Sequence, residues 1–238
     1  MAAANNPAIL PEPDAALSYD PECRRCARLA TFMDDVRTAN PGYFCRPVPP
    51  FGAPGAALVV VGLAPGMHGA NATGRPFTGD HAGIILYETL HAYGFASQPA
   101  STARDDALVL IDCRITNAVK CLPPGNKPAG DEMRACNGYL AADLASLPAG
   151  GAILALGRIA HDAALRALGM RPASQPFTHG ARYALERDAA LFASYHCSRY
   201  NTNTRRLTTA MFRAVFDQIV AHLGRGGRRV RAFPRPDA

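Results

Sequence analysis

The chemically useful side chains of this sequence gather in three polar segments, each of which follows an apolar run. The first segment, residues 62–80, reads GLAPGMHGANATGRPFTGD and ends on the carboxylate of Asp80. The second, ITNAVKC, contains the amide of Asn117, and the third, SYHCSRYNTNTRRLT, contains the imidazole of His196. A carboxylate, an amide and an imidazole can together move protons, read a planar ring and stabilise a developing anion.

The glycine-rich segment 62–80 is suited to close contact with a ligand. Glycines let the backbone approach a bound group, and Phe77, between Pro76 and Thr78, is suited to stack on a planar base. The segment contains neither G-x-x-x-x-G-K-[ST] nor a clean G-x-G-x-x-G, which disfavours a nucleoside triphosphatase and a dinucleotide site. The structural alternative is that Phe77 fills the core and Asp80 caps the following helix.

The other two polar segments suggest contacts with a base and with phosphates. The amide of Asn117 both donates and accepts, so it can read a base edge, although an Asn at a strand end is also a common turn former. Beyond His196, Ser198, Asn201 and Arg205 offer a hydroxyl, an amide and a guanidinium, which together suit a phosphate site. A lone histidine is usually structural, but His196 lies just past a predicted strand.

Four of the seven cysteines have a spacing that suits a metal centre. Cys23 and Cys26 form a C-x2-C pair, and Cys121 and Cys136 form a second pair with fourteen residues between them. The wide second pair fits poorly with the tight knuckles of a zinc ribbon and better with an iron–sulfur cluster. The alternative is a set of unrelated buried or surface cysteines. We expect Cys113, beside an apolar run, in the core.

Apolar runs and helical periodicities define the elements that must carry these segments. Short runs without polar alternation predict buried strands at residues 58–61, 108–111, 153–156 and 191–194. Helices are predicted at residues 82–93, 131–146, 158–168 and 203–223, with a small hairpin at 177–185 that turns at Gly180. The alternation predicts an α/β fold, a three-layer α/β/α sandwich with a central, mostly parallel four-stranded sheet. Ligands of such sheets bind beyond the carboxyl ends of the strands, where the polar segments lie.

Length, charge and composition set the remaining expectations. The 238 residues divide into an extended N-terminal segment (1–20), one domain (21–223) and a basic Gly/Arg/Pro-rich tail (224–238). The net charge of +6 fits a polyanion such as DNA, and the tail offers extra phosphate affinity or merely a solubilising end. The sequence shows no run of about 18 apolar residues and no secretory signal, so we expect a cytoplasmic protein without membrane contacts. We expect a monomer because nothing in the sequence demands more.

Together the motifs resemble those of the uracil-DNA glycosylase superfamily, most closely its family 5, the iron–sulfur type also called type b. The resemblance covers residues 20–223 and rests on the 62–80 segment, on TNAVKCLPP, on HCSRYNTNTRRLT and on the four spaced cysteines. Two positions depart from the family pattern. Cys197 stands where the family usually has proline, and Arg205 replaces the glycine before Arg-Leu-Thr. Because proline fixes φ, Cys197 either loosens the His196 loop or adds a thiol near the site.

The resemblance implies a monofunctional DNA glycosylase, which hydrolyses the N-glycosidic bond of flipped-out uracil and leaves an abasic site for base excision repair. Other deaminated bases such as hypoxanthine are possible substrates. Phe77 would stack on the base, Asn117 would bind its Watson–Crick edge and His196 would stabilise the departing anion. Asp80 would position or polarise the attacking water, or stabilise the cationic sugar. The remaining implied contacts are backbone groups at Gly62, Leu63, Ala64, Pro65 and Gly66, and phosphate-binding side chains at Ser198, Asn201 and Arg205.

The resemblance also implies a structural [4Fe-4S] cluster, held by Cys23, Cys26, Cys121 and Cys136, that joins the N-terminal segment to the sheet. Two other interpretations stay open. One is a family 4-type iron–sulfur uracil-DNA glycosylase, against which the Thr-Gly-Asp sequence at Asp80 argues. The other is a non-catalytic, zinc-containing nucleic-acid-binding α/β module, which would need no catalytic groups at three strand ends.

Overall fold

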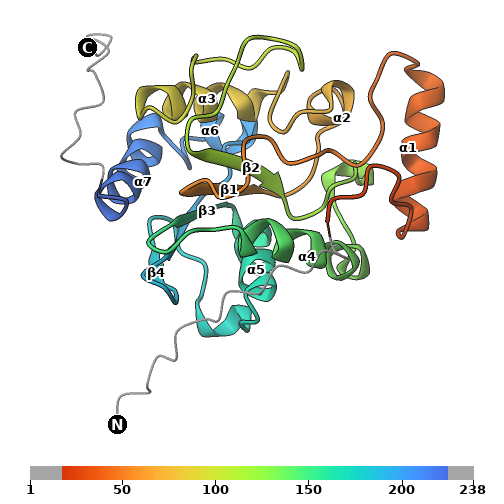
Figure 1. Ribbon diagram of the computed structural model, residues 1–238. Coiled ribbons are helices and arrows are strands. Elements are labelled where there is room, and N and C mark those ends of the chain that lie inside the picture. Colours follow the sequence, from red (N-terminus) through yellow and green to blue (C-terminus); the bar gives the residue numbers. More distant parts are fainter. Residues whose placement is uncertain (1–17, 225–238) are drawn as a thin grey trace.

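The computed structural model describes residues 18–224 and arranges them in three layers (Figure 1). The middle layer is a five-stranded sheet with the strand order β2-β1-β3-β5-β4. Its parallel strands are β1 (Leu58–Gly62), β2 (Cys113–Asn117), β3 (Ala152–Leu156) and β5 (Ala190–Ser194). The short β4 (Arg182–Ala184) runs antiparallel to β5 at the edge. The predicted α/β class is confirmed, with one strand more than expected; the expectations for residues 1–17 and 225–238 lie outside the described residues.

The parallel strands are covered on both faces, which explains their continuous apolar sequences. Every residue of β1, β3 and β5 is buried. Val60 belongs to the apolar cluster with α3 (His81–Ala92) and α7 (Thr209–His222), whereas Val59 belongs to the cluster with α4 (Gly130–Ala145) and α5 (Arg158–Ala167). Alternate strand residues therefore face opposite helical layers, as the pleat of a strand requires.

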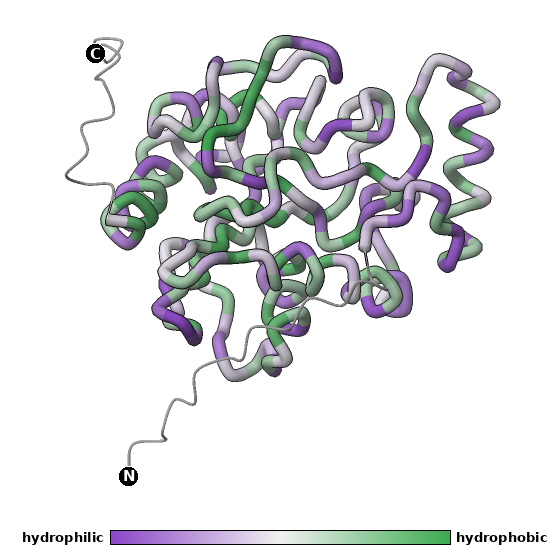
Figure 2. Tube along the Cα trace, in the orientation of Figure 1, coloured by the Kyte–Doolittle hydropathy of each residue, from purple (hydrophilic) through white to green (hydrophobic). Residues whose placement is uncertain are grey.

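A third apolar cluster lies beside the sandwich. Helix α1 (Ala27–Ala39) packs Leu29, Met33 and Val36 near Val119 and Leu122, which follow β2. Figure 1 shows α1 at one end of the molecule, and Figure 2 shows hydrophilic and hydrophobic residues alternating along it. The sequence analysis predicts neither α1 nor the short α2 (Ala70–Thr73). No helix within residues 18–224 is long and apolar enough to cross a membrane.

The predicted strand at residues 108–111 is wrong. This segment forms only an isolated bridge between Ala96 and Leu110, and the side chains of Val109 and Ile111 are 59% and 48% exposed. The strand that pairs with β1 begins at Cys113 and contains the charged Arg114. That residue is accommodated because its guanidinium donates to Asp143 of α4 at 3.0 Å. Because β2 contains a polar residue whose partner is distant in the sequence, it lacks the continuous apolar pattern by which buried strands are predicted.

The predicted last helix, residues 203–223, is also wrong at its start. The chain forms α6 (Arg199–Asn203), breaks, and begins α7 where the Thr208 hydroxyl accepts a hydrogen bond from the Met211 N–H at 3.2 Å. The predicted hairpin at 177–185 contributes β4, whose strand partner is β5 and not another part of the same segment.

Candidate active site

The three polar segments converge at the carboxyl edge of the sheet. β1, β2 and β5 end at Gly62, Asn117 and Ser194, and their parallel pairing sends the loops that follow to the same edge. A cavity of about 350 Å³ opens there, and we call it the base cavity. It is lined, among others, by Leu63, Ala64, Gly66, Phe77, Asp80, Asn117, His196 and Ser198. Its volume suits a small planar ligand.

Glycines of the first segment make room for the side chains around this cavity. A Cβ on Gly62 would clash with Oδ1 of Asn117 and lie 2.6 Å from Cζ of Phe77. A Cβ on Gly69 would lie 2.8 Å from Oδ2 of Asp80. Both distances are shorter than atoms tolerate, so these positions exclude any side chain. Gly62, which does not itself line the cavity, thus acts by allowing Phe77 and Asn117 to approach.

Phe77 is held in a strained conformation at the cavity wall. Its φ of 55° lies in the left-handed region, which is costly for a bulky residue. The side chain is only 6% exposed and belongs to the main apolar cluster. Its ring lies beside the imidazole of His196, with 6.2 Å between the ring centroids. Phe77 is therefore both a core residue and a wall of the cavity.

Hydrogen bonds hold the residues on both sides of Phe77. The Tyr87 hydroxyl donates to the carbonyl of Pro76 at 2.8 Å. On the other side, the hydroxyl of Thr78 lies 2.6 Å from that of Ser101. These bonds hold the strained turn from two directions.

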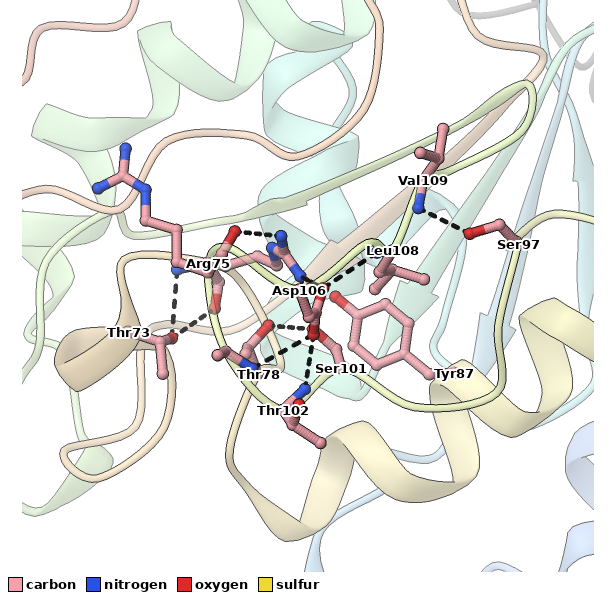
Figure 3. Close-up of polar contacts among 12 residues, drawn as sticks. Thr73, Arg75, Thr78, Tyr87, Ser97, Ser101, Thr102, Asp106, Leu108 and Val109 are labelled. Carbon is pink, nitrogen blue, oxygen red and sulfur yellow. Dashed lines mark hydrogen bonds and ion pairs between the residues drawn. The ribbon is translucent and has the colours of Figure 1, made fainter.

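The centre of this network is the buried ion pair between Arg75 and Asp106 (Figure 3). The Arg75 guanidinium also donates to Ser101 at 3.2 Å, and the Asp106 carboxylate accepts the N–H groups of Thr102 at 2.9 Å and Leu108 at 3.1 Å. Burial opposes ionisation of Asp106, but the hydrogen bonds from Arg75 and the backbone outweigh it and lower its pKa to about 2. The network therefore ties the first segment to the loop before β2.

Asp80 begins α3 as its N-cap residue, and its Oδ1 accepts the N–H of Gly83 at 2.9 Å. Its Oδ2 lies over Gly66 and Gly69, where no side chain intervenes. Burial raises the pKa of Asp80, and the backbone hydrogen bonds from Gly83 and Ala82 oppose this rise only in part. A carboxylate with a raised pKa is a stronger base. The capping role leaves one oxygen available for chemistry.

Asn117 and His196 present free polar groups to the cavity. Neither side chain makes a hydrogen bond to any residue between 18 and 224, although Asn117 is only 3% exposed. Burial lowers the pKa of His196 to about 4, so its imidazole is neutral at pH 7. Both side chains line the cavity, so a bound ligand can pair with their polar atoms. These two groups therefore point to a polar ligand.

The residues predicted to contact phosphates have structural partners in the His196 loop. Ser198 caps α6 by accepting the N–H of Asn201 at 3.4 Å. The Asn201 amide donates to the backbone carbonyl of His196 at 2.8 Å, so it positions the histidine. Arg205 is exposed with a φ of 56°, which explains why glycine suits this position. Cys197, at the other departure from the family pattern, is fully buried.

Three polar residues that line the base cavity are not predicted from the sequence, namely His81, Asn126 and Arg199. His81 joins α3 to α6, because its Nε2 lies 2.9 Å from the Thr202 hydroxyl. None of the three stands in a sequence pattern that marks a binding residue. They reach the cavity only because separate segments fold around it.

The four spaced cysteines line a second, small cavity between α1 and the segment after β2, and we call this the cysteine centre. The Sγ of Cys136 accepts the N–H of Lys120 at 3.3 Å. Burial, reinforced by the neighbouring thiols, raises the pKa of Cys26 to about 11 and raises that of Cys121 further. No three His, Cys, Asp or Glu side chains of the described chain surround a single-ion position. The converging thiols and the backbone donor fit the ligand chemistry of an iron–sulfur cluster.

Residues 49–220 match the family model of the Uracil DNA glycosylase superfamily. The chain belongs to this superfamily. The matched region contains β1, β2, β3 and β5, and with them every strand end that faces the base cavity. It excludes Cys23 and Cys26, so the first half of the cysteine centre lies outside the part of the fold that the superfamily model covers.

Individual members of the superfamily are also similar to the chain. It is 48% identical to the type-5 uracil-DNA glycosylase of Thermus thermophilus over 80% of this chain and 89% of that protein. It is 39% identical to the type-5 enzyme of Pyrobaculum aerophilum over 85% of this chain and 89% of that protein. The chain is 30% identical to the type-4 uracil-DNA glycosylase of Sulfurisphaera tokodaii over 71% of this chain and 72% of that protein. Type 5 is therefore the better match.

Proposed function

We propose that the base cavity is the site where this chain hydrolyses the bond between uracil and deoxyribose in DNA. The observation that carries the proposal is the convergence of Asn117, His196 and Asp80, each with a free polar atom, around the ring of Phe77. The named activity of the type-5 relatives supports the same reaction, that of a uracil-DNA glycosylase, which is a hydrolase acting on N-glycosyl bonds.

Recognition of the base uses the wall and the floor of the cavity. The uracil ring stacks on Phe77, and the amide of Asn117 donates to a carbonyl and accepts from the ring N–H. The Asn117 amide has no partner within residues 18–224, so a ligand in the cavity can pair with its donor and its acceptor without displacing a bond of the protein. Hypoxanthine carries a carbonyl beside a ring N–H as well, so we include it as a candidate substrate.

Cleavage needs a hydrogen-bond donor for the leaving base and a group that orients the attacking water. The base departs as an anion, and the neutral imidazole of His196 donates an N–H to its second carbonyl as charge develops. The free Oδ2 of Asp80 orients and polarises the water that attacks the cationic sugar. The backbone from Gly62 to Gly66 borders this path. Ser198, Asn201 and Arg205 contact the strand that carries the base, with Asn201 also holding His196.

The cysteine centre holds a structural iron–sulfur cluster in this proposal. Cys23 and Cys26 come from the segment before α1, and Cys121 and Cys136 come from the region after β2. The cluster supplies a covalent cross-link between them, and the hydrolysis itself requires no electron transfer. A thiol-rich centre of this kind also favours a reducing compartment such as the cytoplasm.

The decisive experiment is an excision assay. A labelled oligonucleotide with one uracil is incubated with the protein and then treated with hot alkali, which breaks the strand at an abasic site. We expect cleavage at uracil, and a smaller rate for the Asn117→Ala variant than for the matched control Asn203→Ala, whose exposed side chain lines no cavity near the site. Absence of cleavage at uracil, hypoxanthine and xanthine by protein with intact iron absorption would refute the proposal.

A further inference from the structure

The base cavity is the middle one of three hollows at the carboxyl edge of the sheet. A hollow of about 560 Å³ shares Leu63 and His196 with it, and we call this the flanking groove. On the opposite side, a hollow of about 500 Å³ shares Asp80, His81 and Arg199 with it. The three hollows are therefore neighbours along this edge. For a DNA strand whose base enters the middle hollow, the outer two are the nearest hollows that can take its neighbouring nucleotides.

The flanking groove has an aromatic wall. The imidazole of His179 stacks on the ring of Tyr195, with 4.8 Å between centroids and 8° between planes. Phe177 lies against Tyr195 at 6.0 Å and against the buried His161 at 5.6 Å, so the loop that carries it is supported from beneath. Half-buried, supported aromatic rings at the edge of a groove provide stacking surfaces for nucleobases of any sequence.

The groove also offers an unused hydrogen-bond donor. The backbone N–H of Tyr195 donates to Nδ1 of His179 at 3.1 Å. This bond requires Nδ1 to be unprotonated, so the proton of the neutral imidazole is on Nε2. Within residues 18–224 that Nε2–H has no acceptor. It is available to an oxygen of a ligand in the groove.

Charge distinguishes the flanking groove from the opposite hollow. Arg158 and Arg206 line the groove, no acidic residue does, and neither arginine has an ion-pair partner in the described part of the chain. The Arg206 guanidinium lies over the Tyr195 ring at 4.8 Å, which holds it at the groove. The opposite hollow has Glu88 among its lining residues and lacks a Phe, Tyr or Trp. Of the two outer hollows, only the flanking groove therefore combines aromatic rings with positive charge.

We propose that the flanking groove is a binding subsite for the nucleotide next to the flipped base on the same DNA strand. The neighbouring base stacks on Phe177 and His179, and its phosphate lies at Arg206 and Arg158. The subsite draws that nucleotide away from its own stack and thereby helps to keep the damaged base extruded. The proposal rests on the glycosylase function, and its occupant is a nucleotide of any base identity, because stacking and phosphate contacts carry no sequence information.

The first test measures coupling between the groove and the neighbouring base. Excision is followed on single-stranded oligonucleotides in which a baseless tetrahydrofuran spacer replaces the nucleotide on one side or the other of the uracil. With the unaltered protein we expect one of the two spacers to raise KM about fivefold or more, the range of one lost base–aromatic stack. Phe177→Ala should raise KM for the intact substrate by a similar factor. For this variant, replacing the neighbouring nucleotide by the spacer should raise KM little further.

The second test uses an exposed residue, so that folding is not at risk. Arg206→Ala should raise KM and flatten its salt dependence, and a neutral methylphosphonate at the neighbouring phosphate should remove the difference between the variant and the parent. Arg171→Ala, which removes an exposed arginine outside all three hollows, is the matched control and should change neither value.

The outcomes separate the subsite from the glycosylase itself. A parent protein that does not cut uracil removes both proposals. A parent that cuts uracil, with spacer and Phe177→Ala penalties that simply multiply, refutes the subsite and leaves the function intact. In duplex DNA, a spacer on the opposite strand that couples to Phe177→Ala when same-strand spacers do not would assign the groove to a base of that strand, which also overturns the proposal.

Discussion

The base cavity and the cysteine centre both contain residues at or after the end of β2, yet they are held in different ways. The base cavity is preorganised by the protein's own bonds, including the Arg75–Asp106 pair and the cap at Asp80. In the cysteine centre, burial raises the pKa of the thiols, whereas a metal requires them as thiolates. The base cavity is shaped by bonds within the protein, whereas the cysteine centre reaches its thiolate form only when a metal centre binds. Changes to the two regions should therefore have opposite signatures.

The largest expected effect is on the cysteine centre. Cys136→Ala removes a proposed cluster ligand, so the preparation should lose its iron-dependent visible absorption and about 4 kcal/mol or more of unfolding free energy, as losses of a metal site do. The measurements are iron content and thermal unfolding. Cys113→Ala, in the core away from the centre, is the control and should keep its iron. A Cys136→Ala protein with full iron and unchanged unfolding would contradict the cross-linking role.

A change in the base cavity should affect the rate and spare stability. His196→Ala removes a side chain that has no hydrogen bond to lose, and it should lower single-turnover excision by about 10²–10³-fold, the cost of one preorganised donor. Iron content should stay unchanged. If the rate falls less than tenfold while Asp80→Asn abolishes activity, the main electrostatic role belongs to Asp80.

Asp80→Asn should separate catalysis from stability. An Asn side chain can still cap α3, but it cannot act as a base, so excision should fall by about 10²-fold. Because burial raises the folded-state pKa of Asp80 above its unfolded value, the parent loses stability as pH rises through that pKa. The variant should therefore be more stable than the parent at pH 7, and the gap should close below pH 3.8. Asp188→Asn, on an exposed residue, should show neither effect.

The smallest expected effect concerns Arg205. Its positive φ is strained, and Arg205→Gly should raise the unfolding free energy by about 1 kcal/mol at most, because the freedom of glycine in the unfolded chain offsets part of the relief. Arg206→Gly, at a position without positive φ, should destabilise. The same Arg205→Gly variant should bind DNA less tightly if this guanidinium contacts a phosphate. Thermal unfolding of both variants, together with DNA binding of the parent and Arg205→Gly, decides between these effects.

The polar segments could be located from the sequence because they follow short, continuous apolar runs, and such runs indicate buried strands. Parallel strands buried on both faces must be continuously apolar, which is why β1, β3 and β5 stand out. β2 does not stand out, since it contains the polar residues Arg114 and Thr116, both of which donate to Asp143 on α4. The apolar residues 108–111, in contrast, lie partly exposed on a loop. A local pattern cannot report a partner that is distant in the sequence.

The sequence by itself determined the class of the sheet, the edge where a ligand binds and the chemical types at that edge. Glycine at positions 62 and 69 leaves space for neighbouring side chains. The carboxylate, amide and imidazole can be recognised as reactive groups from the residue types alone. Only the tertiary structure decided that Asn201 supports His196, that Arg75 and Asp106 hold Phe77, and that Phe177, Tyr195 and Arg206 form one groove. The physical reason is that side-chain chemistry is a property of single residues, whereas burial, hydrogen-bond partners and cavities arise from segments that meet only in the folded chain.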